Sequence, residues 1–139
     1  MAARGKINSK YQGMNWCAPA KRLAIYLRDG LACAYCGQGI ENSARLTLDH
    51  IVPFSASGKS DNRETNLVTA CLQCNSGRGN RDLSVFCHTV AQYLDHGVSG
   101  QEIYDHVQSC LARPIDRKEA KAIIDRRGGF SLALSGFRG

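Results

Sequence analysis

The chain has 139 residues, the length of one small domain with room for appended helices. Hydrophobic residues make up 43% and charged residues 22%, which are ordinary values for a soluble globular protein. The formal net charge of +6 favours a polyanionic partner such as nucleic acid. No apolar run is long enough to span a membrane, and residues 1–12 lack the apolar segment of a secretory signal. Together with an odd number of cysteines, seven, these features predict a cytoplasmic protein with no membrane partner and no disulfide framework.

The positive charge is concentrated near the N-terminus, where residues 1–30 carry six lysines and arginines against Asp29 alone. Residues 1–15 show no regular pattern and are predicted to form a basic arm. Such an arm commonly lies along phosphates, but a solvated tail that aids solubility is an equally good interpretation. The sequence leaves both open.

A helix is predicted from Pro19 to Asp29, because proline suits the first turn of a helix and Gly30 suits its end. A tight knuckle is expected next, between Cys33 and Cys36, because the glycines that follow allow the chain to turn back. The packing face of the helix would contain Trp16, Leu23, Tyr26 and Leu27.

Two strands and a helix are predicted after the knuckle. Residues 45–51 alternate well enough for a strand, which Pro53 ends before a polar loop at residues 55–65. Residues 66–70 are predicted to form a second short strand. A helix is expected over residues 71–80, and its first turn would carry Cys74 and Asn75.

The rest of the chain is predicted to be mostly helical. Three helix starts are marked by capping patterns, at Asp82, at Ser99 with Glu102, and at Asp116 with Glu119. Residues 130–139 show no clear period and are expected to be a loose tail. The chain therefore divides into a basic arm (1–15), a core (16–82) and a helical C-terminal extension (83–139).

Four of the seven cysteines form two Cys-x-x-Cys pairs, Cys33/Cys36 and Cys71/Cys74. Thiolates at this spacing can hold one tetrahedral Zn²⁺, which would stabilise a domain that has only a modest core. The alternative of four ordinary buried thiols is less favoured, because a turn-forming glycine accompanies the first pair.

A second metal site is a minor alternative. It would use Cys87 with His88, or His106 with Cys110. The preferred interpretation is that Cys17, Cys87 and Cys110 pack as small hydrophobes.

Polar residues between and after the cysteine pairs are candidates for catalysis. The carboxylate of Asp49 and the amide oxygen of Asn75 are hard ligands, which suit Mg²⁺ or Mn²⁺ and leave positions open for phosphate and water. His50 is the candidate general base, because an imidazole with an ordinary pKa of about 6.5 can take a proton from water near neutral pH. On a regular strand Asp49 and His50 would point to opposite faces, so we expect the chain to bend there.

This pattern resembles the core of HNH (His-Asn-His) endonucleases, and more narrowly their four-cysteine zinc branch, common in phage and bacterial proteins. The resemblance covers residues 33–82. The segments that carry it are Asp49–Pro53, Ser57–Gly58, Asn66–Val68, Cys71–Asn75 and Arg78–Asn80. It implies an α+β fold, in which a small ββα-metal (His-Me finger) core is pinned by the zinc site and flanked by an N-terminal helix and C-terminal helices.

The resemblance also implies an activity and roles for further residues. The activity is hydrolysis of DNA phosphodiester bonds, by nicking or double-strand cleavage, in a bacterial or phage-infected cell. Asn66 would brace the loop and hold His50 in place. The third position of the pattern is Asn75 rather than histidine, which predicts a metal site that discriminates against Zn²⁺. The candidate phosphate contacts are Lys59, Arg63, Arg78 and Arg81, of which the last two are equally well interpreted as solvated helix charges.

Phage DNA processing, homing and restriction are contexts in which such endonucleases occur. The alternative function is a non-catalytic zinc-stabilised module that binds nucleic acid. The presence together of Asp49, His50, Asn66 and Asn75 argues against that alternative, because a pure binding module needs neither a base nor hard metal ligands. The apolar C-terminal helices suggest a homodimer as a further possibility.

Overall fold

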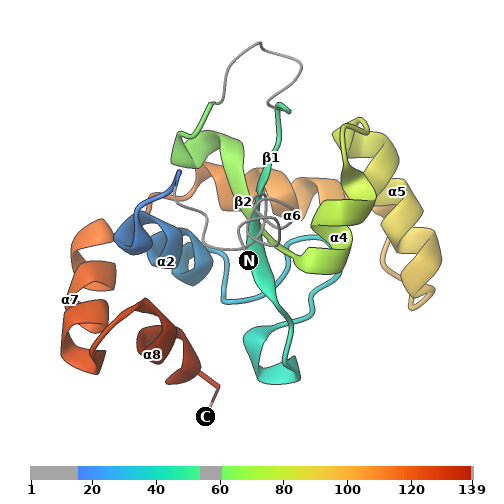
Figure 1. Cartoon of the computed structure of the whole chain (residues 1–139). Coiled ribbons are helices and arrows are strands. Elements are labelled where there is room, and N and C mark those ends of the chain that lie inside the picture. Colours follow the sequence, from blue (N-terminus) through green and yellow to red (C-terminus); the bar gives the residue numbers. More distant parts are fainter. Residues whose placement is uncertain (1–15, 54–60, 139) are drawn as a thin grey trace, which may run out of the picture.

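The computed structural model describes residues 16–53 and 61–138 (Figure 1). The two strands are β1 (Leu46–His50) and β2 (Leu67–Cys71). The helices are α2 (Pro19–Arg28), α4 (Leu72–Arg78), α5 (Leu83–Leu94), α6 (Gly100–Ala112), α7 (Arg117–Arg127) and α8 (Phe130–Ser135), with short 3₁₀ turns at Ile40–Asn42 and Glu64–Asn66. The predicted α+β class is confirmed. None of the helices in the described ranges has both the length and the apolar character needed to cross a membrane.

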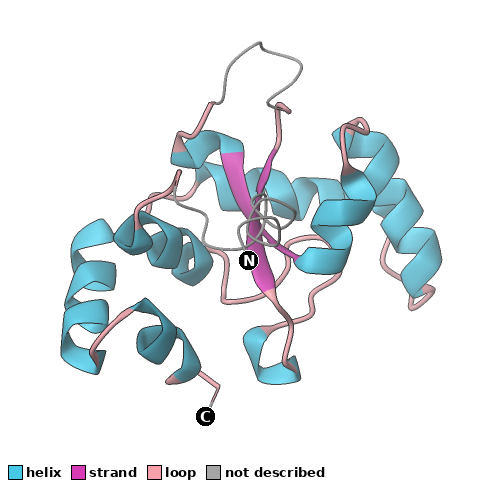
Figure 2. Ribbon diagram, in the orientation of Figure 1, coloured by secondary structure: helices cyan, strands magenta, loops and turns pink. Residues whose placement is uncertain are grey.

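At the centre of the molecule the two strands form an antiparallel sheet (Figure 2). Leu46 pairs with Cys71 and His50 pairs with Leu67. Helix α4 follows β2 without a connecting loop and packs back on both strands. This is the strand, loop, strand, helix order that the resemblance implies, and it brings Asn75 of α4 over β1.

The knuckle at residues 33–36 lies against β2. The amide of Cys33 donates to the carbonyl of Gln38 at 2.9 Å, and the amide of Ala34 donates to the carbonyl of Thr69 at 2.9 Å. Gly37 has a φ of +81°, a conformation that L side chains rarely adopt, so a glycine is needed for the chain to turn back. The hydrogen bond to Thr69 fixes the first cysteine pair beside the second, which begins where β2 ends.

Helix α2 is fixed across the sheet by buried polar contacts. Arg28 and Asp29 form an ion pair of 2.7 Å whose side chains are almost completely buried. Arg28 also donates to the carbonyl of Leu67, while Asp29 accepts from the amide of Thr69. Of the predicted packing face, Leu23 and Tyr26 are fully buried, and Trp16 and Leu27 are half-buried.

The C-terminal helices occupy two places (Figure 1). Helices α5 and α6 pack against each other and share a core with the knuckle and β2, to which Tyr35, Phe86 and Val107 contribute. Helices α7 and α8 pack against α2 through a second core that includes Leu23 and Ile123. The three predicted caps are present: the side chains of Asp82, Ser99 and Asp116 accept hydrogen bonds from main-chain amides three residues later.

The prediction of a loose tail at residues 130–139 is wrong, because residues 130–135 form α8. Ala133 is completely buried, Phe130 packs against the core around α2, and Arg127 donates to the carbonyl of Ala133 at 2.8 Å. A six-residue segment has little helical stability of its own, so its helix depends on tertiary packing. The spacing of Phe130, Ala133 and Phe137 is the apolar signal that the glycines and serines obscured.

Candidate active site beside a four-cysteine metal centre

The four paired cysteines converge at one point, where their Sγ atoms all lie within 4.8 Å of one another. Cys36 and Cys71 are 3.8 Å apart at sulfur. A tetrahedral Zn²⁺ with Zn–S bonds of about 2.3 Å has edges of about 3.8 Å, so these residues fit the ion. The amides of Cys36 and Cys74 point at the sulfurs of Cys33 and Cys71, at 3.5 and 3.4 Å. The geometry of the four cysteines therefore suits a tetrahedral metal ion such as zinc.

Hydrogen bonds among these thiols shift their pKa values in opposite directions. The hydrogen bond with Cys33 lowers the pKa of Cys36 to about 7, and also lowers the pKa of Cys71. The hydrogen bond with Cys36 raises the pKa of Cys33, and that with Cys33 raises the pKa of Cys74. Crowded thiols cannot all ionise unless a cation compensates their charge. A Zn²⁺ ion would let all four bind as thiolates.

The other three cysteines are buried, as expected for small hydrophobes: Cys17, Cys87 and Cys110 are at most 5% exposed. Within residues 16–53 and 61–138, the only cluster of three or more potential metal-binding Cys, His, Asp or Glu side chains is the one already described. The pair of His106 and Cys110 is 3.7 Å apart, but no third ligand joins it in this part of the chain. The minor alternative of a second metal site receives no support there.

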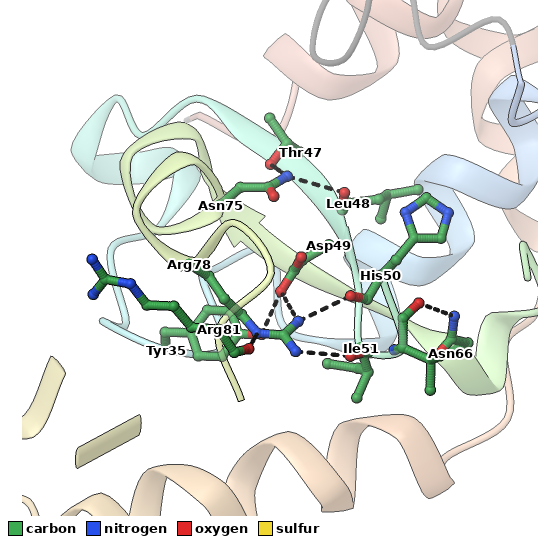
Figure 3. Close-up of polar contacts among 11 residues, drawn as sticks. Tyr35, Thr47, Leu48, Asp49, His50, Ile51, Asn66, Asn75, Arg78 and Arg81 are labelled. Carbon is green, nitrogen blue, oxygen red and sulfur yellow. Dashed lines mark hydrogen bonds and ion pairs between the residues drawn. The ribbon is translucent and has the colours of Figure 1, made fainter. Parts of the chain in front are cut away.

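Asp49 and Asn75 lie on the same side of β1 (Figure 3). The Nδ2 group of Asn75 donates to Thr47 Oγ1 at 2.9 Å and to the carbonyl of Leu48 at 3.1 Å. Thr47 and Asp49 share a face of the strand because side chains alternate along it. Both candidate metal ligands are buried, with 4% of Asp49 and 2% of Asn75 exposed. Their Oδ1 atoms make no hydrogen bond with the described residues. These oxygens are the atoms that would coordinate a hard cation.

The other carboxylate oxygen of Asp49 is held by two donors. Tyr35 donates its hydroxyl to Oδ2 at 2.5 Å, and Arg78 donates Nη1 to the same atom at 2.9 Å. Arg78 is 2% exposed and also donates to the carbonyls of His50 and Ile51. The expectation that Arg78 is a solvated charge or a phosphate contact therefore needs correction. Its guanidinium makes its contacts inside the protein, where it compensates the charge of the buried Asp49 carboxylate.

His50 leaves β1 on the face opposite to Asp49 (Figure 3). Its Nε2 lies 2.8 Å from Oδ1 of Asn62, and its ring centroid lies 4.9 Å from that of Trp16. With Asn62 accepting, the proton is on Nε2 and the Nδ1 lone pair is available to take a proton. The expected bend between Asp49 and His50 is wrong. The strand runs through both residues, and the chain bends at residues 51–52 instead.

Asn66 makes the contacts that bracing of the loop requires. Its Oδ1 accepts from the amide of Val52 at 2.9 Å, and its Nδ2 donates to the carbonyls of Val52 and Asp61. Asn66 therefore joins the two sides of the loop that follows β1. Asn62, which contacts His50, is next to Asp61 in this loop. Among the described residues, Asn66 is therefore linked to His50 through Asp61 and Asn62 of the loop, and no hydrogen bond joins it to Asp49.

The remaining candidate phosphate contacts differ in their surroundings. Arg81 is exposed and lines a groove together with residues of α4 and α5. Arg63 is exposed and pairs with Asp61 at 2.8 Å, and the hydrogen bond from Arg63 lowers the pKa of Asp61 to about 2. Lys59 and Ser57–Gly58 lie outside the described residues, as does the basic arm at 1–15. Their contacts with nucleic acid stay predictions.

Two residues of the site had not been assigned a role from the sequence. Tyr35 lies inside the first cysteine pair, in a Tyr-Cys-Gly segment that fits the four-cysteine branch without indicating a role for the tyrosine. Asn62 is one polar residue among several in the loop after Pro53. Neither has a spacing that could identify it, because each reaches its partner through the tertiary fold.

The family model "HNH endonuclease" matches residues 33–81. This confirms the resemblance: the chain carries an HNH endonuclease domain over those residues. The match begins at Cys33, the first of the four clustered cysteines, and ends just after α4, so it covers the knuckle, the sheet and the helix that bears Asn75.

The chain is also similar to two CRISPR-associated endonucleases Cas9. It is 33% identical over 104 residues to that of Corynebacterium diphtheriae, covering 71% of this chain and 9% of the relative. It is 44% identical over 65 residues to that of Actinomyces naeslundii, covering 47% of this chain and 6% of the relative. The chain thus spans less than a tenth of the length of these relatives. A crystal structure of the Type II-C Cas9 enzyme from Actinomyces naeslundii matches 99% of this chain and 13% of that chain, with 27% identity and a TM-score of 0.47.

Proposed function

We propose that this protein is an endonuclease that hydrolyses DNA phosphodiester bonds with one divalent ion and a histidine base. The observation that carries the proposal is that two hard ligands, Asp49 and Asn75, lie on one side of β1, while His50 is the next residue of the strand and leaves it on the other side. The HNH match and the printed names of the relatives, both endonucleases, support the reaction class. DNA as substrate is supported by the net charge of +6 and by the resemblance.

Asp49 and Asn75 would hold Mg²⁺ or Mn²⁺ through their Oδ1 atoms. One carboxylate and one amide oxygen are a hard donor set that leaves most coordination positions to water and phosphate. Such an ion would act as a Lewis acid and neutralise the negative charge that develops on the scissile phosphate. Arg78 forms a 2.9 Å ion pair with Asp49 and so compensates the charge of this buried carboxylate.

His50 would take the proton from the attacking water at Nδ1. Asn62 holds the other ring nitrogen, and Trp16 lies beside the ring, so the imidazole has a defined orientation. His50 and Asp49 are the last two residues of β1, and we place the scissile phosphate at this end of the strand. Asn66 holds the loop that supplies Asn62 and thereby supports the base indirectly.

The test is cleavage of supercoiled plasmid by zinc-loaded protein with Mg²⁺, with Mn²⁺ or with EDTA. We expect open-circular or linear product that requires the divalent ion and is lost in His50→Ala. Native mass spectrometry of the same sample should show one tightly bound zinc per chain. A folded, zinc-containing protein that shifts the plasmid in a gel but never cuts it would contradict the proposal. That result would favour the non-catalytic binding module instead.

The comparisons bear on the biological context as well. Both relatives are CRISPR-associated, so CRISPR-associated cleavage is the context they favour over phage DNA processing, homing or restriction. A homodimer through the C-terminal helices stays a prediction. Much of the apolar surface of those helices is used inside the chain, against the knuckle and against α2.

A further inference from the structure

Asp49 is buried with one carboxylate oxygen engaged and the other without a partner among the described residues. Oδ2 accepts hydrogen bonds from Tyr35 and Arg78, at 2.5 and 2.9 Å (Figure 3). Two donors that converge on one oxygen fix the rotation of the carboxylate about its Cβ–Cγ bond. The orientation of Oδ1 is therefore set by Tyr35 and Arg78 before any ion binds.

Tyr35 is itself held rigidly. It lies between Cys33 and Cys36, its ring meets Phe86 edge-on with centroids 5.0 Å apart, and only 2% of the residue is exposed. The adjacent Ala34 donates its amide to the carbonyl of Thr69 on β2. The knuckle and the core thus determine where the hydroxyl points. A phenol fixed in this way positions its partner at little entropic cost.

The chemistry of the hydroxyl suits a donor role. The Tyr35 hydroxyl carries a proton that it can donate, and in this contact it donates that proton in a hydrogen bond to Oδ2 of Asp49. Arg78 pairs with the Asp49 carboxylate at 2.9 Å, so the charge of Asp49 is compensated without Tyr35. What the tyrosine adds is direction, because Arg78 also serves the carbonyls of His50, Ile51 and Arg81.

We propose that Tyr35 is a positioning residue that orients the Asp49 carboxylate so that its Oδ1 atom binds the divalent ion together with Asn75. The inference rests on the proposed function, since it concerns the same metal site. The zinc knuckle thereby contributes to the metal site directly through one side chain, in addition to stabilising the fold. Residues that hold a metal ligand by hydrogen bonds commonly change metal affinity about 10- to 100-fold when they are replaced.

Tyr35→Phe tests this, because it removes one oxygen and keeps the ring that packs on Phe86. We expect Mn²⁺ affinity, measured from the loss of the free Mn²⁺ signal in electron paramagnetic resonance, to fall about 10-fold or more. The metal concentration for half-maximal cleavage should rise in parallel, while the rate at saturating metal changes little. Tyr93→Phe is the matched control, since the same atom is removed from a side chain that is 86% exposed.

A double-mutant cycle separates positioning from a general structural effect. If Tyr35 acts through Asp49, adding Tyr35→Phe to Asp49→Asn should cause no further loss of Mn²⁺ affinity. Unchanged Mn²⁺ affinity in Tyr35→Phe would overturn the inference and leave the proposed function standing. A variant that loses its zinc would also overturn it, because Tyr35 would then act by building the knuckle. Wild-type protein that fails to bind Mn²⁺ would overturn the proposed function and this inference together.

Discussion

The His50 ring is hydrogen-bonded to Asn62 in the folded chain, and we propose that this contact orients the ring. We predict that Asn62→Ala lowers the cleavage rate at saturating metal and leaves Mn²⁺ affinity unchanged. The rate should fall about 10-fold or more, because misplacing a catalytic group by ~1 Å can cost about 10²-fold. Single-turnover cleavage measures the rate, with Asn42→Ala as a control distant from His50. An unaltered rate would mean that Asn62 does not orient the base.

Arg78 is a buried charge, 2% exposed and paired with Asp49, rather than a solvated charge on a helix. Replacing it by methionine would leave the Asp49 carboxylate buried with Tyr35 alone. We expect the free energy of unfolding to fall by about 3–5 kcal/mol, as for other buried ion pairs from which one partner is removed. Urea denaturation measures this. Arg81→Met, at an exposed position three residues further on, should change stability by no more than about 0.5 kcal/mol. Equal effects of the two substitutions would rule out the buried-pair interpretation.

At the scale of elements, α8 depends on its contacts with α2 and α7. Ala133 is fully buried and its neighbour Leu132 is 58% exposed. Ala133→Asp should therefore lower the free energy of unfolding by about 3 kcal/mol or more, because it buries an unpaired charge, whereas Leu132→Asp should have little effect. Thermal unfolding of the two variants compares them directly. If both are tolerated, residues 130–135 do not pack as described.

The elements that could be predicted from the sequence are those with local signals. The knuckle follows from its cysteine pairs, three helix starts from their caps, and the strands from alternation and flanking breakers. The bend predicted between Asp49 and His50 is wrong, because the strand continues through both residues. Local patterns do not predict helix α8, the Asn62 contact or the Tyr35 contact, for one shared reason. Each is determined by residues distant in sequence, on which local patterns carry no information.

At the scale of the whole molecule, the positive charge near the N-terminus raises the question of whether the basic arm contacts DNA. Residues 1–12 contain Arg4, Lys6 and Lys10, and lie outside the described structure. If they contact phosphates, replacing all three by glutamine should lower DNA affinity and flatten its salt dependence. The slope of log K against log salt should decrease by roughly 0.9 per lost contact. Binding titrations at several salt concentrations provide the measurement, and an unchanged slope would favour the solvated tail.

The sheet lies between two helical groups that serve different parts of the site. Helices α5 and α6 pack against the knuckle that carries Tyr35, whereas α7 and α8 support α2. Helix α2 in turn contacts the loop of His50, since Lys21 donates to the main-chain carbonyl of Asn62. The C-terminal residues 83–139 therefore support both sides of the site, through separate cores.

The location of Tyr35 between two of the four clustered cysteines also limits how related sequences can diverge. A homologue that replaced the four cysteines by an apolar core would lose the fixed phenol with them. Its metal-binding aspartate would then need a hydrogen-bond donor from another element. We expect the tyrosine and the four cysteines to be inherited or lost as one unit, so that an alignment of homologues should show them covarying.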